Sequence, residues 1–134
     1  MAEFIVFEGI DGSGKSTQAR ALHRRLLHRQ HQVLLVHEPG GTPIGESLRR
    51  WVKRRQGLYP LTELYLFNAA RAQLVEQVIR PALEKGVTVV ADRFSASTVA
   101  YQNYGRGLDL ELVLQMNQGA TSGLSPNLTV FLDC

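Results

Sequence analysis

One cysteine, Cys134, is present in the 134 residues, so no internal disulfide can form. This absence excludes the disulfide-stabilised folds of small secreted proteins, and we expect a reducing compartment. Long hydrophobic runs are lacking as well. The apolar residues that precede Glu8 are too few for a signal peptide or a membrane span, and acidic Glu3 lies among them. We therefore expect a soluble, cytoplasmic protein with no membrane partner.

Charge of one sign is not in large excess either. The formal net charge is +3, and the densest basic stretch, Arg49 to Arg55, would spread over more than one face of a helix. This spread favours a solvated helix surface over a nucleic-acid-binding patch, so no nucleic-acid partner is expected. The histidines are scattered without a cysteine cluster, which gives no support for a zinc site. Repeats, low-complexity segments and linkers are absent, so residues 1–134 are interpreted as a single domain.

Apolar runs alternate with helical patterns along the chain, which is typical of a parallel sheet. Continuous apolar runs predict strands over residues 3–8, 33–37, 87–91 and 128–133. These runs lack polar alternation, as expected of strands that are covered by helices on both faces. Apolar residues at helical spacing predict helices over 16–30, 61–84 and 109–118, the second of them kinked or restarted at Pro81. The pattern predicts an α/β fold with a central parallel sheet.

The segment FEGIDGSGKSTQ, residues 7–18, follows the first predicted strand and has Gly9, Gly14, Lys15 and Ser16 at the spacing G-x-x-x-x-G-K-[ST]. Glycines in such a loop let backbone N–H groups point inward, and the following helix adds the positive end of its dipole. This arrangement holds a polyphosphate, with the lysine at the β- and γ-phosphates and the serine hydroxyl at magnesium. An ordinary glycine-rich turn is the alternative. The spacing directly after a strand favours binding of a nucleoside triphosphate.

The third predicted strand leads to Asp92, which is followed by Arg93. A carboxylate at the end of that strand is in the usual place to hold magnesium through water. A water-activating ATPase would be expected to have a carboxylate in place of Arg93, and the N-K-x-D signature of a GTPase does not occur. A cation beside the metal-binding acid instead suits an acceptor that is itself a phosphate. A plain surface ion pair between the two residues is the alternative.

Four stretches together resemble bacterial thymidylate kinases: FEGIDGSGKST, EPGGTPIGE (38–46), LFNAARAQ (66–73) and DRFSASTVAYQNYGRG (92–107). The resemblance runs from Glu3 to Asp133. It implies a P-loop kinase fold of three layers, a central parallel sheet flanked by helices, in which strand 3 lies beside strand 1. That order would bring Asp92 close to Ser16. The resemblance also implies transfer of the γ-phosphoryl group of ATP to dTMP, giving dTDP and ADP in dTTP synthesis, with Mg²⁺ as a cofactor.

Carried over position by position, the resemblance assigns overlapping sets of site residues. The ATP phosphates would be held by Gly9, Ile10, Asp11, Gly12, Ser13, Gly14, Lys15, Ser16 and Thr17. The dTMP site would be formed by Asp11, Glu38, Pro39, Arg49, Phe67, Arg71, Arg93, Ser97, Thr98, Tyr101 and Gln102. The catalytic residues would be Lys15, Arg93, Asp92 and Asp11. Magnesium would be held by Ser16 and, through water, by Asp92.

For the base and the sugar, the resemblance implies specific contacts. Phe67 would lie against the thymine ring and Arg71 at its polar edge, one helical turn further on. Phe67 also fits the apolar stripe of its helix, so core packing is the alternative. Thr98 and Gln102 would meet the base and the deoxyribose. Tyr101 against the sugar would leave no room for a ribose 2′-hydroxyl, which favours deoxynucleotides by exclusion.

For the phosphate and the 3′-hydroxyl, the implied contacts are charged. Arg49 and Arg93 would hold the dTMP phosphate, with an exposed surface position as the alternative for Arg49. Asp11 would face the 3′-hydroxyl of the acceptor, with Glu38 near by. The alternative for Asp11 is a side chain that caps its own turn.

In relatives with this kind of loop, a further arginine lies on a mobile lid after the fourth strand, whereas this sequence stops at Cys134. With the lid and the last strand absent, we expect either a longer biological protein or a polypeptide that is poorly stable and binds without useful turnover. Family members are usually homodimers, so a homodimer packed through the helices of 44–84 is expected. Two alternatives stay open: a P-loop kinase for another small acceptor, and a non-catalytic nucleotide-binding module.

Overall fold

The structure is a computed structural model that describes residues 2–10, 12–54 and 57–132, without the side chains of residues 97, 100 and 101. The strands are β1 (Phe4–Gly9), β2 (Val33–His37), β3 (Thr88–Asp92) and β4 (Leu128–Leu132). The helices are α1 (Lys15–His28), α2 (Pro43–Arg54), α3 (Pro60–Leu74), α4 (Arg80–Glu84), α5 (Ser95–Thr98) and α6 (Leu110–Thr121). Two π-helical turns are η1 (Val75–Ile79) and η2 (Val99–Gly105). The predicted strands are confirmed, each bound shifting by at most one residue.

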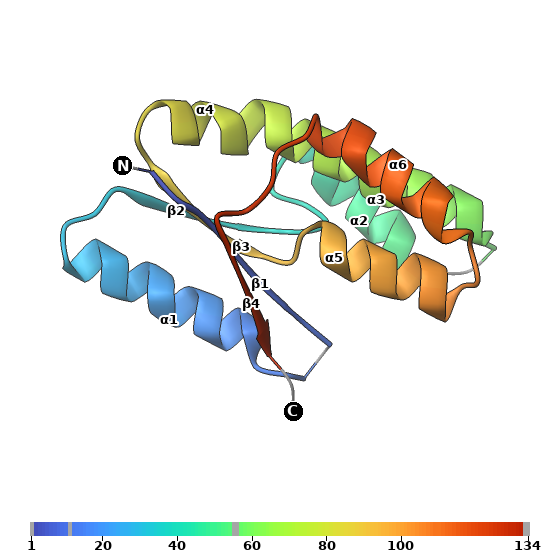
Figure 1. Ribbon diagram of the computed structural model, residues 1–134, viewed down its shortest axis with the longest axis horizontal. Helices are drawn as coiled ribbons and strands as arrows, with labels where there is room; N and C mark the ends of the chain where they lie inside the picture. The colour runs from blue at the N-terminus through green and yellow to red at the C-terminus, as the bar shows by residue number, and fades with distance from the viewer. Residues whose placement is uncertain (1, 11, 55–56, 133–134) are drawn as a thin grey trace.

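The strands form one parallel sheet in the order β2-β3-β1-β4 (Figure 1). β3 therefore lies beside β1, as the resemblance implied, and Phe7 is opposite Asp92 in their register. Because parallel strands point the same way, the loop that follows β1 and the last residue of β3 meet at one edge of the sheet. This edge is where ligands bind in open α/β sheets.

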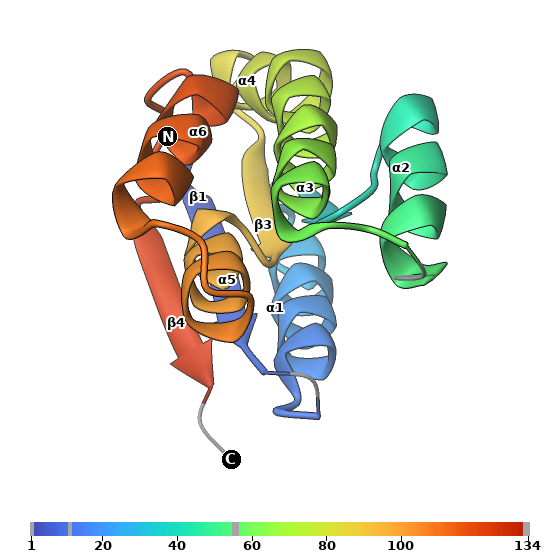
Figure 2. The same cartoon turned by 90° about the vertical axis from the view of Figure 1, so that its right-hand side faces the viewer.

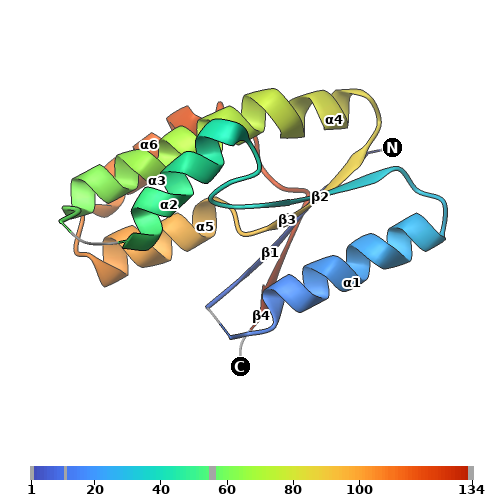
Figure 3. The same ribbon diagram turned by 180° about the vertical axis from the view of Figure 1, so that it is seen from behind.

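Helices cover both faces of the sheet, so the fold has three layers (Figure 2, Figure 3). On one face, Phe7 and Val90 form a core cluster with Ala19 of α1. On the other face, Phe4 and neighbouring strand residues pack against Leu74 of α3 in a second cluster. Successive residues of a strand point to opposite faces, so a continuous apolar run supplies both clusters at once. The three-layer α/β fold expected from the sequence is confirmed.

The helical run predicted over 61–84 extends from Pro60 to Glu84 as α3, η1 and α4. Proline has no N–H, and its ring crowds the carbonyl group four residues earlier, which for Pro81 is that of Gln77. Gln77 lies inside η1, where the wider π turn makes room for such a disturbance. The helix therefore continues through Pro81 instead of restarting there, and the irregular turn precedes the proline.

The last predicted helix, 109–118, is longer in the structure and is capped. Asp109 precedes α6, and its side chain accepts a hydrogen bond of 3.4 Å from the backbone N–H of Leu112. Tyr104 and Gly105, which precede this helix, lie at the end of η2. Within the described ranges, no helix is long and apolar enough to cross a membrane.

Candidate nucleotide-binding site

The glycine-rich loop joins β1 to α1 at the carboxyl edge of the sheet. Gly9 has a φ of 154°, and a Cβ atom at this position would lie 2.8 Å from the carbonyl oxygen of Leu132. Gly14, which precedes α1, has a φ of 90° in the left-handed region. A side chain at Gly9 would therefore clash, and the backbone of Gly14 favours glycine. The first N–H groups of an α-helix lack acceptors within the helix, so the start of α1 beside this loop suits an anion.

Side chains of the loop differ in their surroundings. Lys15 is buried and is the first residue of α1, whereas Ile10 is 70% exposed. The hydroxyl of Ser13 is buried without a hydrogen-bond partner. Asp11, expected to take part in both ATP and dTMP binding, lies outside the described residues. The part of the loop that can be described is thus formed by backbone groups and a single inward lysine.

Ser16 and Asp92 are in direct contact, as the predicted strand order requires. The Ser16 hydroxyl donates a hydrogen bond of 2.5 Å to Oδ2 of Asp92. Oδ1 of the same carboxylate is buried and has no hydrogen-bond partner. A hydroxyl and a carboxylate are oxygen ligands of the kind that Mg²⁺ prefers, and this ion usually keeps several waters and binds substrate phosphates as well. The two side chains therefore fit the magnesium site expected here.

A cavity of about 720 Å³ opens beside this pair. It is lined by Lys15, Ser16, Ala19, Arg20, Leu35, Val36, His37, Glu38, Pro39, Arg49, Val52, Lys53, Phe67, Asp92 and Arg93. Phe67 is half-buried and lines this cavity, and it does not belong to either core cluster formed by the described residues. Cations outnumber carboxylates in the lining, which suits a polyanionic ligand with one apolar portion.

Glu38 lies in the segment after β2 and lines the cavity. One carboxylate oxygen, Oε1, accepts a hydrogen bond of 2.8 Å from Nε of Arg71. The other, Oε2, is buried without a hydrogen-bond partner. Burial raises the pKa of Glu38 above its usual value, and the charge and hydrogen bond of Arg71 only partly oppose this shift. A buried carboxylate with one free oxygen is thus available to a ligand in the cavity.

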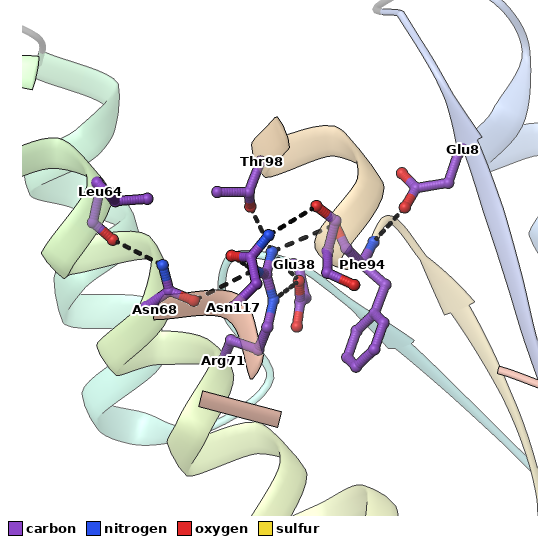
Figure 4. Close-up of polar contacts among 9 residues, drawn as sticks. Glu8, Glu38, Leu64, Asn68, Arg71, Phe94, Thr98 and Asn117 are labelled. Atoms are coloured by element: carbon purple, nitrogen blue, oxygen red, sulfur yellow. Dashed lines mark hydrogen bonds and ion pairs between the residues drawn. The ribbon is translucent and has the colours of Figure 1, made fainter. Parts of the chain in front are cut away.

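Arg71 is held by a network of buried acceptors (Figure 4). Its side chain is 2% exposed, and its guanidinium donates to Glu38, Asn68, Asn117, Thr98 and the carbonyl oxygen of Phe94. The acceptors come from α3, α5, α6 and two loops, so Arg71 ties these segments together. A guanidinium has five N–H groups, and here each of them has an acceptor to use. Arg71, predicted at the edge of the thymine ring, is not among the residues that line the cavity.

The predicted residues of 95–105 whose side chains the structure describes, Thr98 and Gln102, are both buried. Thr98 is buried and its hydroxyl accepts a hydrogen bond of 2.6 Å from Arg71. Gln102 is fully buried, and its amide nitrogen donates to Glu63. Neither residue lines the cavity. The side chains of Ser97 and Tyr101 lie outside those the structure describes, so their predicted roles stay predictions.

The phosphate-binding arginines predicted from the sequence both line the cavity. Arg93 has a φ of 79°, an uncommon value for a residue with a side chain, and its N–H bonds to the carbonyl oxygen of Phe7. Arg49 lies on α2, 3.6 Å from Glu46, with its side chain 36% exposed. The EPGG segment that precedes α2 is held by Glu46, which accepts a hydrogen bond of 2.8 Å from the N–H of Gly41. That bond lowers the pKa of Glu46, and His37 contributes further.

Several residues of the site were missed by reasoning from the sequence. Arg20 and Lys53 line the cavity, each one helical turn after a predicted site residue, Ser16 or Arg49. That spacing was a usable signal. The other missed residues are buried polar groups that organise the site: Glu8, Glu63, Asn68 and Asn117. Glu8 accepts a hydrogen bond of 3.1 Å from the N–H of Phe94 (Figure 4), and nothing in its local sequence distinguishes it from a surface acid.

Comparison with known proteins identifies the family. The model of the thymidylate kinase family matches residues 7–134, which is nearly the whole chain. The chain belongs to the thymidylate kinase family. A thymidylate kinase of known crystal structure, from Ehrlichia chaffeensis, is similar with a TM-score of 0.95 and 41% sequence identity over 99% of this chain and 77% of that one.

Curated thymidylate kinases are similar at about half of all positions. One from Dehalococcoides mccartyi is 50% identical over 99% of this chain and 65% of its own length. Another from Chlorobaculum tepidum is 52% identical over 96% of this chain and 61% of its own length. The chain therefore spans less than two thirds of the length of these thymidylate kinases.

Proposed function

We propose that the protein transfers the γ-phosphoryl group of ATP to dTMP, giving dTDP and ADP. The observation that supports this most strongly is the continuity of the cavity. It reaches from Lys15, Ser16 and Asp92 at the glycine-rich loop to Phe67, Pro39 and Glu38 on the opposite wall. A phosphate-binding loop at one end and an aromatic face at the other suit two ligands that meet at their phosphates. Membership of the thymidylate kinase family supports the same assignment.

On the donor side, the N–H groups of residues 9–17 would bind the ATP phosphates, and Lys15 would neutralise the β- and γ-oxygens. Ser16 and Asp92 would hold Mg²⁺, which when bound neutralises phosphate charge and orients the triphosphate. Asp92 has an oxygen without a partner for this purpose. Lys15 is already buried, so its charge would be directed at the ligand through little water.

On the acceptor side, we assign the dTMP phosphate to Arg93 and Arg49, with Arg20 and Lys53 as further cations of the lining. Phe67 would stack on the thymine ring, and the free oxygen of Glu38 would accept a hydrogen bond from the acceptor near its 3′-hydroxyl, together with Asp11. The backbone of Arg93 is held in an uncommon conformation, which is typical of residues placed for function. Every N–H group of Arg71 already has an acceptor, so Arg71 would have to give up one of these hydrogen bonds to form one with the base.

The transfer itself asks the protein mainly for alignment and charge neutralisation. An oxygen of the dTMP phosphate would form the new bond to the γ-phosphorus, and the bond to the β–γ bridging oxygen would break, leaving ADP. The attacking oxygen belongs to a phosphate and needs no strong base. Lys15 and Arg93, which face the same cavity, would neutralise the transferring group from two sides.

The test is formation of dTDP from ATP and dTMP in the presence of Mg²⁺, with dUMP and a reaction without acceptor measured in parallel. We expect dTDP and a preference for dTMP over dUMP. Binding of ATP and dTMP without any dTDP would instead indicate a nucleotide-binding module. Faster phosphorylation of dUMP or of a different small acceptor would indicate another kinase. An Asp92→Asn variant should abolish turnover and retain dTMP binding, which separates chemistry from recognition.

A further inference from the structure

The backbone of Arg93 has a conformation that its place in the chain does not explain. Among the described residues, three other than glycine have a positive φ: Gln30, Arg93 and Ser122. Gln30 and Ser122 follow the ends of α1 and α6, where a left-handed residue is a common way to stop a helix. Arg93 instead follows a strand, and it is the one of these three that lines the cavity. A left-handed residue with a long side chain persists only where its surroundings hold it.

Two successive residues of β1 hold the peptide groups on either side of Arg93. The N–H of Arg93 donates a hydrogen bond of 2.9 Å to the carbonyl oxygen of Phe7. The N–H of the next residue, Phe94, donates one of 3.1 Å to Oε2 of Glu8 (Figure 4). Peptide groups are planar, so the first bond fixes the plane before the Cα atom of Arg93 and the second fixes the plane after it. Together the two bonds set φ and ψ of Arg93.

The second of these bonds depends on a side chain. Phe7 offers a backbone carbonyl group, which any residue at that position would supply. Position 8 can bond the N–H of Phe94 only through a side-chain acceptor. Glu8 is 2% exposed, and a carboxylate in such a place is costly unless it is hydrogen-bonded. The identity of residue 8 therefore decides whether the peptide group after Arg93 is held.

Phe94 is also anchored by contacts that do not involve Glu8. Its ring is 1% exposed and meets the ring of Phe4 edge to face, with 5.0 Å between the ring centroids. Its carbonyl oxygen accepts a hydrogen bond of 3.2 Å from Nη2 of Arg71. These contacts would keep Phe94 in place without Glu8. What Glu8 adds is the orientation of the N–H group, which belongs to the peptide group shared with Arg93.

We propose that Glu8 is a positioning residue for the phosphate of the acceptor: its carboxylate holds the peptide group after Arg93 and thereby keeps the Arg93 side chain at the cavity. Glu8 is not among the described residues that line the cavity, so it acts through its neighbour. This inference rests on the proposed function, in which Arg93 binds the dTMP phosphate. Without the carboxylate, Arg93 would relax to a common conformation with negative φ, and its guanidinium would leave the phosphate. The contacts of the base and the sugar would not change.

The experiment measures equilibrium binding of dTMP, and of thymidine, which lacks the phosphate, to the wild-type protein and its variants. The ratio of dTMP affinity to thymidine affinity isolates the contribution of the phosphate. Glu8→Met has a side chain of similar length without an oxygen acceptor. It should reduce this ratio about tenfold and leave thymidine affinity unchanged, because a charge-assisted contact is lost. Glu84→Met, at an exposed acid that ends α4, is the matched control and should alter neither affinity.

Two further variants separate the hydrogen bond from charge and size. Glu8→Gln keeps an oxygen that can accept from the N–H of Phe94, so it should retain most of the ratio. Glu8→Asp keeps the charge but is one methylene shorter, so it should lose the ratio as Glu8→Met does. The aspartate variant also serves if the methionine variant does not fold. A glutamine variant whose ratio falls as far as that of Glu8→Met would overturn the proposal, because the acceptor would then not be what matters.

A double-mutant cycle shows whether Glu8 acts through Arg93. Arg93→Ala removes the guanidinium, and Glu8→Met in that background should not reduce the ratio further. A further tenfold loss there would contradict the proposal.

The remaining outcomes distinguish the positioning role from the proposed function. An unchanged ratio in Glu8→Met, or an equal loss of dTMP and thymidine affinity, would refute the positioning role and leave the proposed function intact. A wild-type protein that binds thymidine as tightly as dTMP would refute the phosphate contact in the proposed function, and the role of Glu8 with it.

Discussion

The two ends of the cavity are formed in different ways. At the glycine-rich loop, the site is formed mainly by backbone groups and the start of α1, and some side chains, such as Ile10, are largely exposed. Beside the cavity wall formed by Glu38, buried side chains from several segments hold one another, with Arg71 at their centre although it does not itself line the cavity. A site formed by the backbone tolerates most side-chain changes except at its glycines and its lysine. A site formed by interlocked side chains does not, because each residue completes the bonding of others.

The difference also concerns charge. The acceptor end contains a buried ion pair, Glu38 with Arg71, whose side chains are 4% and 2% exposed. Such a pair adds little net stability, but removing one partner leaves an uncompensated buried charge. Lys15 at the donor end differs from this pair, because we propose that its charge is compensated by a ligand that arrives from solvent. The two ends should therefore respond to substitution through different measurements, stability at one and affinity at the other.

The largest effect is expected for Arg71→Met, which breaks the buried network. Glu38, Asn68, Asn117 and Thr98 would lose their donor, and the free energy of unfolding should fall by about 3–5 kcal/mol. Urea unfolding followed by circular dichroism measures this. The double variant Glu38→Gln with Arg71→Met removes the unpaired charge and should recover part of the loss. If the single variant were as stable as the wild type, the network would have no role in the fold.

The same variant should be sensitive to pH. Burial already raises the pKa of Glu38, and loss of Arg71 removes what opposes that shift. A raised carboxyl pKa means that the folded state binds the proton more readily than the unfolded chain does. The contribution of Glu38 to the free energy of unfolding therefore falls as pH rises from the unfolded pKa through the folded pKa. The deficit of Arg71→Met should therefore be smaller at about pH 5.5 than at about pH 8. It should be independent of pH once Glu38 is replaced by glutamine.

Lys15→Ala should weaken ATP binding by about 2–3 kcal/mol, because a charge-assisted contact to phosphate is lost. Calorimetric titration of ATP into the folded variant checks this. Binding of dTMP should change much less, which is the sharpest contrast between the two ends. Lys85→Ala, an exposed lysine after α4, serves as the control. Unchanged ATP affinity in Lys15→Ala would mean that the loop is an ordinary turn.

Phe67→Ala should weaken dTMP binding by about 1–3 kcal/mol, on the scale known for bases stacked on aromatic side chains. ATP affinity should be unaffected, since Phe67 is on the opposite wall from the loop. Tyr65→Ala on the same helix is a matched control, because that ring is 59% exposed. An equal loss of both ligands, together with lower stability, would show that Phe67 packs the domain instead of binding the base.

The smallest effect is expected for Glu46→Gln, which weakens the bond to Gly41 that holds the EPGG segment. The carboxylate is 40% exposed, so solvent screens it and the loss of stability should be about 1 kcal/mol or less. The pKa of Glu46 is lowered, so its contribution is present above the unfolded pKa and is lost as pH falls through the lower folded value. Thermal unfolding at neutral and acidic pH should show a difference between variant and wild type only at neutral pH.

Much of the fold could be predicted from the sequence because its signals are local. Continuous apolar runs predicted the strands, and helical spacing predicted α1, the long run of α3 to α4, and α6. The glycine-rich loop was predicted from its spacing, and Gly9 shows why: a side chain there would meet the Leu132 carbonyl oxygen. The periodicity did not predict α5 and η2. It also did not predict the π turn before Pro81, since that turn depends on how the helix relieves its own crowding.

The sequence by itself determined the loop, the strands and the acid that follows the third apolar run, because each is encoded within a few neighbouring residues. Only the tertiary structure decided the partners of buried polar side chains. The local sequence around Arg71 does not indicate that this charged residue is buried. Its burial is possible only because acceptors from Glu38, Thr98 and Asn117 converge on it. Apolar periodicity tells which face of a helix turns inward, but not which distant segment will satisfy a charge placed there. That assignment depends on how the layers pack, and packing brings together residues that the sequence keeps far apart.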